Sequence, residues 1–344
     1  KNIIIKEDFN LQNIAWCGFG GKCKYYVKVS SKESLIFVLD LLEDLKIQFS
    51  IIGETTNMFF LEDVTYGVII NVSEMNNYEI GQKEIFCEAG ANLQLFMRKI
   101  YSASISGFEG LEGIPGSLGG ALYINAGAYG YSISNNLLEI NVYDTKKKKE
   151  LKILKDNCEY EHRGSTFKKN KHLVILSAVF SINNGDLKSI QSSVEKFHTA
   201  RHSYQEFAFP NLGSVFSSYK SIYNLYESFD IGYKVKSKLV SKIYYNSFAR
   251  FINRKNPYRK KINNLLINHF RLTKNKVQIH SDKNLNTFAF KGQKAQEILL
   301  FYAEIKKKLG KEIFIENVIL DTNIVDNKIE NWTELKGIIA ILKK

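Results

Sequence analysis

The pattern of apolar and polar residues along the first 80 residues predicts a mixture of strands and helices. Tyr25–Val29 and Tyr66–Val72 are rich in aromatic and β-branched residues, which favours strands. Phe49–Ile52 predicts a buried strand that runs into a loop at Gly53. Between the first two strands, apolar residues recur three and four positions apart, at Leu35, Val38, Leu39 and Leu42. This spacing predicts an amphipathic helix, so the segment combines α and β structure.

The same reasoning extends the mixture of strands and helices to the end of the chain. Strands are expected at Ile85–Gly90, Leu138–Tyr143 and Val174–Ile182, a charged hairpin tip at Lys146–Glu150, helices at Leu93–Ile100, 186–206 and Ala295–Leu309, and a closing strand at Ile313–Val318. The last helix is the clearest, with Ile298, Leu299, Tyr302, Ile305 and Leu309 on one face.

A glycine-rich stretch from Gly107 to Gly130, GFEGLEGIPGSLGGALYINAGAYG, stands out from these regular patterns. It contains eight of the 22 glycines and one of only three prolines. A loop of this kind bends tightly and points several backbone N–H groups at one place, and such groups bind anions, most often phosphates. The stretch is therefore interpreted as a cofactor cradle. A tight turn between core strands is the structural alternative.

Composition and charge narrow the classes of protein. The 344 residues are 44% hydrophobic and 24% charged, as in globular proteins with a sizeable core. The net charge of +13 suits anionic ligands such as a dinucleotide or a nucleotide sugar, although a general lysine bias gives the same value. Basic residues are spread out without a nucleic-acid motif, and no stretch is apolar enough for a membrane helix.

The four cysteines, Cys17, Cys23, Cys87 and Cys158, lack metal-ligand spacing. They are expected to be reduced, mostly buried thiols of a cytoplasmic protein, and no metal site is expected.

The segment IPGSLGGALYINAGAYG, Ile114–Gly130, resembles the signature of the flavin-dependent UDP-N-acetylenolpyruvoylglucosamine reductases of peptidoglycan synthesis. Three more segments agree in the family's order: Ile52–Phe59 resembles the first flavin loop, Cys158–Lys168 the segment with a conserved arginine, and Pro210–Phe216 the segment with the catalytic serine. Four segments in order are far more specific than any one of them.

The resemblance implies an α+β fold: a two-subdomain FAD-binding fold of the PCMH type, in the vanillyl-alcohol-oxidase-like superfamily, followed by a smaller α+β substrate domain. It places the first FAD-binding subdomain at 1–80, the second at 81–185 and the substrate domain at 186–344. It also implies FAD as cofactor, NADPH as reductant and a nucleotide-sugar substrate; no nucleic acid or membrane is expected as a partner.

The family's cofactor residues transfer to the two loops of this sequence. The first loop supplies Gly53, Glu54, Thr55, Thr56, Asn57 and Met58, and the second supplies Ile114, Pro115, Gly116, Ser117, Gly119, Gly120, Asn125, Gly127, Ala128, Tyr129 and Gly130. Thr55 stands where the family has glycine, which makes backbone access to the diphosphate poorer.

Three residues match the family's catalytic positions. The resemblance implies that Arg163 holds the substrate's enolpyruvyl carboxylate and that Ser214 donates the proton that completes the reduction. The closing strand of the family carries Leu-Glu-x-Glu, whose second acid assists proton transfer. Val318 occupies that position here, so Glu316 serves only if the strand is shifted. His162 replaces the usual tyrosine beside Arg163 and makes the site sensitive to pH.

The chain departs from the family most strongly at about 217–261 and at 276–280, where a Gly-Gly pair is missing. Tyrosines of this insertion, Tyr223, Tyr226, Tyr233, Tyr244 and Tyr245, either line a sugar or base pocket or belong to a solvated helical insertion. Three functions stay open: reduction of the enolpyruvyl ether of UDP-N-acetylglucosamine to UDP-N-acetylmuramate, a related oxidoreductase acting on another sugar nucleotide in surface-polysaccharide synthesis, or a flavin-binding protein without catalysis.

Overall fold

The computed structural model describes residues 2–244, 258–272 and 281–344. Its strands are β1 (Ile3–Asn10), β2 (Lys22–Val29), β3 (Phe49–Ile52), β4 (Met58–Phe60), β5 (Val64–Asn71), β6 (Tyr78–Ile80), β7 (Glu84–Glu88), β8 (Gly127–Ala128), β9 (Tyr131–Ser132), β10 (Leu137–Asp144), β11 (Lys149–Leu154), β12 (Leu173–Ser181), β13 (Phe216–Ser217), β14 (Phe314–Ile315), β15 (Val318–Leu320) and β16 (Ile324–Asn327). Its α-helices are α1 (Lys32–Asp44), α2 (Leu93–Ser102), α3 (Leu118–Tyr123), α4 (Thr166–Lys169), α5 (Leu187–Tyr204), α6 (Ile222–Phe229), α7 (Ile231–Tyr244), α9 (Tyr258–Phe270), α10 (Ala295–Leu309) and α11 (Trp332–Lys343).

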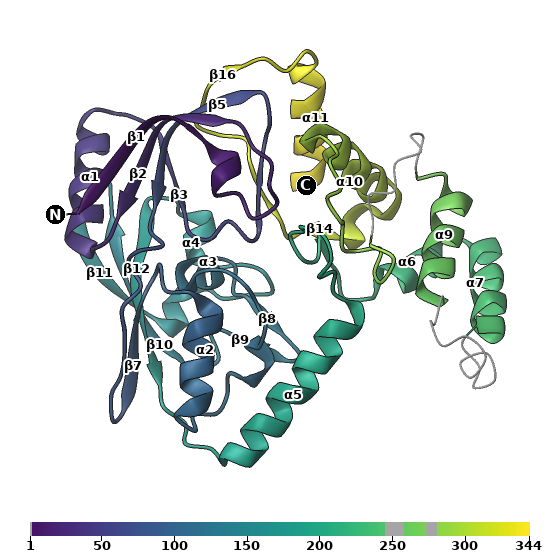
Figure 1. The fold of residues 1–344 in the computed structure, drawn as a ribbon, viewed down its shortest axis with the longest axis horizontal. Helices are drawn as coiled ribbons and strands as arrows, with labels where there is room; N and C mark the ends of the chain where they lie inside the picture. The colour runs from purple at the N-terminus through teal and green to yellow at the C-terminus, as the bar shows by residue number, and fades with distance from the viewer. Residues whose placement is uncertain (1, 245–257, 273–280) are drawn as a thin grey trace.

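The first sheet is built around β5, which is buried along nearly its whole length. β2 lies parallel to one edge of β5 and carries β1 antiparallel on its far side. β3 and β16 share the other edge, β3 in parallel and β16 antiparallel (Figure 1). A strand from the end of the chain therefore completes the sheet made by its beginning.

The second sheet is antiparallel throughout, in the order β11-β10-β12-β7-β6. Since β6 joins it, residues 78–80 belong structurally with the strands that follow them. The divisions at 80 and 185 drawn from the sequence stay predictions. Helix α1 lies between the sheets, because its buried Leu35, Val38 and Leu39 share one apolar cluster with residues of both β5 and β12.

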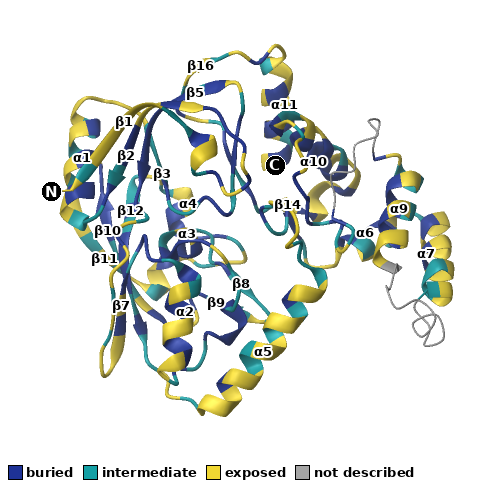
Figure 2. Ribbon diagram, in the orientation of Figure 1, coloured by how far each residue is buried: buried dark blue, intermediate teal, exposed yellow. Residues whose placement is uncertain are grey.

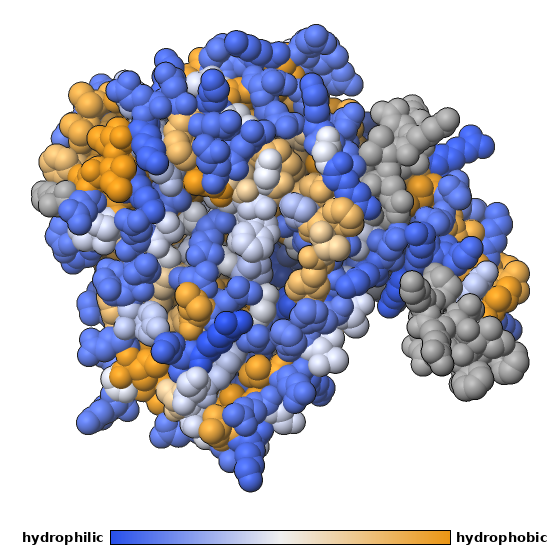
Figure 3. Space-filling model, in the orientation of Figure 1, coloured by the Kyte–Doolittle hydropathy of each residue, from blue (hydrophilic) through white to orange (hydrophobic). Residues whose placement is uncertain are grey.

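Helix α5 leads from the second sheet to the helices at the right of the molecule (Figure 1). Only Ile190 and Arg201 of its 18 residues are buried, so most of its surface faces solvent (Figure 2). Beyond it, α10 and α11 pack on the first sheet through a continuous apolar core. The face in Figure 3 is mainly hydrophilic, with apolar side chains in scattered groups. No helix in the described ranges has the length and apolar character to cross a membrane.

From Ile222 onwards the described part of the insertion is mainly helical, through α6, α7 and the start of α9. Tyr226 and Tyr233 are fully buried and pack on Phe270, with ring centroids 4.5 and 5.2 Å away. The suggestion that these two tyrosines line a ligand pocket is therefore wrong, since both are buried in an apolar core. Tyr245 and the missing Gly-Gly position at 276–280 lie outside the described residues.

The predicted closing strand Ile313–Val318 is broken in two. β14 pairs antiparallel with β13, whereas β15 runs parallel to β4. Glu316 and Asn317 form the break, because their polar groups bond to loops on either side and not to a neighbouring strand. The other strands and helices expected from the sequence patterns are present within three residues of their predicted ends.

All four cysteines are free and buried. Burial raises the pKa of the Cys17 and Cys158 thiols to about 11 and that of Cys23 to about 12, and it also raises the pKa of Cys87. The unfolded chain ionises its thiols near the ordinary value of 9.0, at a lower pH than the folded chain does.

We therefore expect the free energy of unfolding to fall as the pH rises from 9 towards 11, because only the unfolded state gains thiolates in that range. Urea titrations of the wild type and of a Cys17→Ala, Cys158→Ala variant measure the slope. The variant loses part of the alkaline decline. An identical slope in both proteins contradicts the assignment to the thiols.

Replacement of glycine by alanine should have opposite effects on the free energy of unfolding at two positions, Gly90 and Gly337. A Cβ on buried Gly90 would lie 1.8 Å from the carbonyl oxygen of Val72, whereas one on exposed Gly337 within α11 would meet nothing within 4 Å. Gly90→Ala should lower the free energy of unfolding by about 1–3 kcal/mol or more, and Gly337→Ala should raise it by roughly 0.5–1 kcal/mol. Urea denaturation measures both, and equal effects contradict the packing described here.

Candidate active site

Side chains of the first predicted cofactor loop, between β3 and β4, form hydrogen bonds with other parts of the protein. The carboxylate of Glu54 accepts two contacts from Nδ2 of Asn92 at 2.7 and 2.9 Å. The Thr55 hydroxyl donates to the carbonyl of Ile14, and the Thr56 hydroxyl donates to the carbonyl of Pro115 at 3.1 Å. Thr55 adopts a left-handed φ of 58°, which explains why the family favours glycine here. What this loop has left for a ligand is its backbone.

The second loop brings its glycines against the first. A Cβ on Gly53 would lie 2.2 Å from Oγ of Ser117, and one on Gly116, whose φ is +125°, would lie 2.8 Å from Oγ1 of Thr56. Ser117 caps the short helix α3 by accepting from the N–H of Gly120, and the N–H of Gly119 bonds to the carbonyl of Ala89. Side chains at Gly53 or Gly116 would push the loops apart.

Backbone N–H groups on both sides of this contact have no protein acceptor within the described residues: those of Glu54, Thr56, Asn57, Gly116 and Ser117. Gly116, Ser117 and Thr56 are nevertheless buried. Buried N–H groups are rarely left unpaired in proteins, so their convergence indicates a ligand rich in acceptor oxygens. The diphosphate of a dinucleotide fits this requirement.

The end of the glycine-rich stretch forms a two-residue hairpin, β8–β9, with Tyr129 and Gly130 at left-handed φ values. Nearby, Asn125 donates to the carbonyl of Glu161, and its buried Oδ1 has no partner among the described residues. This unpaired oxygen is a second feature that suits a bound group with an N–H donor.

Tyr129 faces helix α5. Its ring stacks on Phe197 with centroids 4.7 Å apart, its hydroxyl bonds to that of Tyr204, and the guanidinium of Arg201 lies 5.6 Å from the ring centroid. Burial and the bond to Tyr204 raise the pKa of the Tyr129 phenol, which therefore stays neutral. These contacts engage the ring and the hydroxyl of Tyr129 within the protein, and its contact with the cofactor stays a prediction.

The remaining predicted cofactor residues lie in varied surroundings. Ile114 packs on the apolar cluster beside the second sheet, and Pro115 is exposed. Met58 and Ala128 lie in the short strands β4 and β8.

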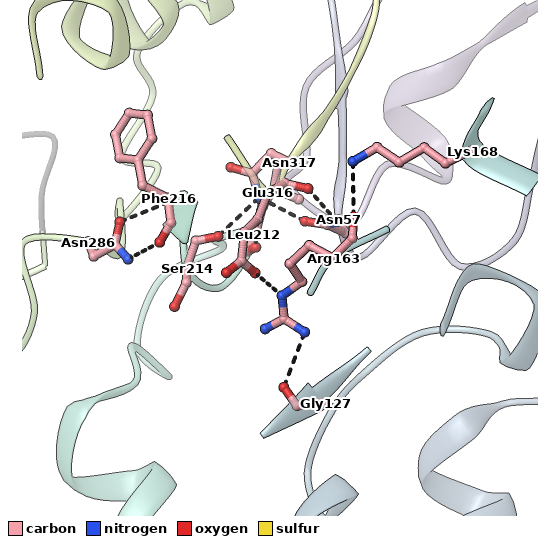
Figure 4. A network of polar contacts seen from close by, with 10 residues as sticks. All are labelled: Asn57, Gly127, Arg163, Lys168, Leu212, Ser214, Phe216, Asn286, Glu316 and Asn317. Atoms are coloured by element: carbon pink, nitrogen blue, oxygen red, sulfur yellow. Dashed lines mark hydrogen bonds and ion pairs between the residues drawn. The ribbon is translucent and has the colours of Figure 1, made fainter. Parts of the chain in front are cut away.

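Arg163 lies at the tip of a two-residue turn closed by mutual hydrogen bonds between Glu161 and Gly164. Its φ of 58° is left-handed, and its NH1 donates to the carbonyl of Gly127 at 3.2 Å. Its Nε lies 3.1 Å from Oε2 of Glu316, which forms an ion pair with side chains only 24% and 13% exposed (Figure 4). The break in the closing strand thus places Glu316 against Arg163, and its catalytic role stays a prediction.

Ser214 lies beside this ion pair (Figure 4). The next residue, Val215, accepts the N–H of Glu316 through its carbonyl at 2.8 Å, so Ser214 and Glu316 are on neighbouring segments. The Ser214 side chain is half-buried, and its hydroxyl has no hydrogen bond within the described part of the chain. Val318, at the family's second acid position, instead pairs with Met58 in β15–β4.

Three asparagines that the sequence reasoning did not assign to catalysis hold these segments. Asn57 donates through Nδ2 to the carbonyl of Glu316 at 2.9 Å and accepts through Oδ1 from Nδ2 of Asn317 at 2.8 Å. Asn286 bonds both the N–H and the carbonyl of Phe216, two residues after Ser214. The cue in the sequence is weak: polar amides inside otherwise apolar stretches.

A cavity of about 320 Å³ opens beside Glu316. His162, Asn284, Asn286 and Glu316 line it, and the rest of its wall is the continuous segment 216–223. Arg163 is not part of this wall and reaches it through Glu316. Most of the wall therefore comes from the segment in which this sequence departs from the family.

We expect Gly53→Ala to weaken FAD binding roughly tenfold or more, because the new methyl group collides with Ser117 and moves the unpaired N–H groups apart. Adding Ser117→Gly removes the colliding atoms at the cost of only a small part of the cap's stability. The double variant should recover most of the affinity, measured by flavin fluorescence titration. Equal affinity in all three proteins would show that the contact between the loops does not shape the site.

Comparison with known proteins agrees with this geometry. Residues 23–148 match the FAD binding domain family. The UDP-N-acetylenolpyruvoylglucosamine reductase of Carboxydothermus hydrogenoformans is 34% identical over 221 residues, which are 64% of this chain and 72% of that protein. The protein of the same name from Pseudothermotoga lettingae is 35% identical over 212 residues, 62% of this chain and 72% of its own.

The crystal structure of UDP-N-acetylenolpyruvylglucosamine reductase from Thermus caldophilus aligns with a TM-score of 0.65 at 18% identity. The alignment covers 92% of this chain and 98% of that one, which shows a shared fold. The predicted α+β FAD-binding fold is confirmed, and the chain belongs to the UDP-N-acetylenolpyruvoylglucosamine reductase family of FAD-binding oxidoreductases.

Proposed function

We propose that the protein uses NADPH and FAD to reduce the enolpyruvyl ether of UDP-N-acetylglucosamine to UDP-N-acetylmuramate, a reaction of soluble metabolites in the cytoplasm. The observation that carries the proposal is the meeting of Arg163 and Glu316, 3.1 Å apart, next to the segment of Ser214. The two relatives named UDP-N-acetylenolpyruvoylglucosamine reductase, at 34% and 35% identity, support it.

The residues present fit FAD. The unpaired N–H groups of the 53–58 and 114–120 loops suit its diphosphate, and the unpaired Oδ1 of Asn125 offers an acceptor. Once reduced by NADPH, bound FAD would supply a hydride to the methylene carbon of the substrate.

Arg163 has the properties needed to hold the substrate carboxylate. A guanidinium keeps its charge and presents parallel donors, and NH2 of Arg163 has no protein acceptor within the described ranges. As negative charge develops on the carbon next to the carboxylate, a fixed cation at this place stabilises it. The ion pair with Glu316 and the hydrogen bond from NH1 to the carbonyl of Gly127 orient the guanidinium.

Ser214 is the proposed proton donor to that carbon. Its hydroxyl is free of protein partners in the described structure, so a ligand can receive its hydrogen bond. Glu316, on the adjacent segment, takes the place of the acid that Val318 lacks and supports the transfer. Since an acid does reach the site, the alternative of a flavin protein without catalysis has less support.

A second candidate is reduction of a different sugar nucleotide. The observation in its favour is the cavity wall, in which segment 216–223 carries a 95% exposed Tyr219 and Lys220 in place of the family's sequence. In this second candidate, these residues contact the part of the substrate remote from the reacting carbon.

Anaerobic rapid mixing distinguishes the candidates. NADPH should bleach the yellow absorbance of the FAD-loaded protein, and UDP-N-acetylenolpyruvoylglucosamine should restore it. Restoration only by another sugar nucleotide selects the second candidate, and restoration only by oxygen contradicts both.

In the same assay, Ser214→Ala should leave flavin reduction by NADPH intact and slow its re-oxidation by substrate roughly 10²–10⁴-fold, the effect expected when a positioned proton donor is lost. Ser228→Ala, in α6, serves as the control and should react like the wild type, since its hydroxyl only bonds the carbonyl of Leu225. Near-normal re-oxidation in Ser214→Ala would show that another group is the acid.

A further inference from the structure

The side chains of Asn57 and Asn317, here called the amide bridge, connect the first cofactor loop to the segment of the proposed proton donor. Nδ2 of Asn317 lies 2.8 Å from Oδ1 of Asn57, 3.1 Å from the carbonyl oxygen of Leu212 and 3.4 Å from that of Ser214 (Figure 4). One amide group therefore joins three segments that are up to 260 residues apart in sequence.

The orientation of Asn317 is determined by its surroundings. Its side chain is 4% exposed, and all three groups facing Nδ2 are acceptors. A flipped amide would place Oδ1 against three oxygens, so only the observed orientation is stable. The consequence is a buried Oδ1 without a partner among the described residues.

The other half of the amide bridge reaches the acid. Asn57 donates to the carbonyl of Glu316, and its own carbonyl accepts the N–H of Val318 at 2.9 Å. Asn57 belongs to the loop whose unpaired N–H groups suit the cofactor. These bonds connect the loop to Glu316 and, through Asn317, to the backbone of Ser214.

We propose that Asn317 is a positioning residue that couples occupation of the cofactor loop to the placement of Ser214. The proposal rests on the proposed function for the role of Ser214, but the coupling itself needs only that FAD binds. In this account, the proton donor segment 212–216 becomes ordered when the loop 53–58 is filled.

Hydrogen exchange read by mass spectrometry tests the coupling without any substrate. In the wild type, FAD should slow amide exchange about tenfold or more in both 53–58 and 212–216, because binding suppresses local opening. In Asn317→Ala, the slowing should persist at 53–58 and fall below about twofold at 212–216. Asn317→Ser, which keeps one donor, should give an intermediate result and serves if the alanine variant does not fold.

Asn136→Ala is the matched control. Asn136 is also a buried amide, 9% exposed, that joins loops through Ser106 and Asn183, but it does not contact the 53–58 or 212–216 segments. It should behave like the wild type. Loss of protection at 212–216 in this control, or full protection in Asn317→Ala, overturns the proposal.

Flavin half-reactions give the functional readout. Asn317→Ala should be reduced by NADPH within about twofold of the wild-type rate, and its re-oxidation by substrate should slow about 100-fold, as expected for a donor misplaced by about 1 Å. Equal losses in both half-reactions would mean a general structural effect and contradict the positioning role. If the wild type binds FAD but no enolpyruvyl sugar re-oxidises it, the proposed function fails while the exchange experiment still decides the coupling.

Discussion

The hydrogen bonds of Asn57 to the 316–318 segment are the contacts on which the rest of the site depends. They join the 316–318 segment to the loop between β3 and β4, and β15 then runs parallel to β4. This connection breaks the closing strand at Glu316 and brings the Glu316 carboxylate to Arg163. Arg163 lies between β11 and β12, two strands of the second sheet. The ion pair is thus a product of the way the two ends of the chain are joined.

Much of this arrangement could be predicted from local pattern. The amphipathic faces of α1 and α10 and the glycine-rich loop are encoded by neighbouring residues, and each appears where its spacing places it. The resemblance to the reductase family, now confirmed, further directed attention to Arg163, Ser214 and Glu316, and the structure gathers all three. Their roles stay predictions, as do the domain limits and the individual cofactor contacts.

What local pattern could not reveal depends on long-range partners. The strand 313–318 looks continuous in sequence, and only the bonds of Glu316 and Asn317 to distant loops break it. The hydroxyls of Thr55 and Thr56 resemble ligand donors until their acceptors at Ile14 and Pro115 are known. Tyr226 and Tyr233 likewise resemble a binding surface until the helices of the insertion bury them. In each case the sequence gives the residue type, but only the structure identifies the partner of that residue.

The central claim is that FAD lies between the two loops with Arg163, Ser214 and Glu316 facing the substrate. A crystal structure of the flavin-loaded protein with UDP-N-acetylenolpyruvoylglucosamine tests it most directly. The account predicts the diphosphate of FAD on the N–H groups of Thr56, Gly116 and Ser117, the substrate carboxylate on Arg163, and the Ser214 hydroxyl on the side of the reacting carbon opposite the flavin ring. A ring bound elsewhere, or a substrate carboxylate remote from Arg163, would contradict it.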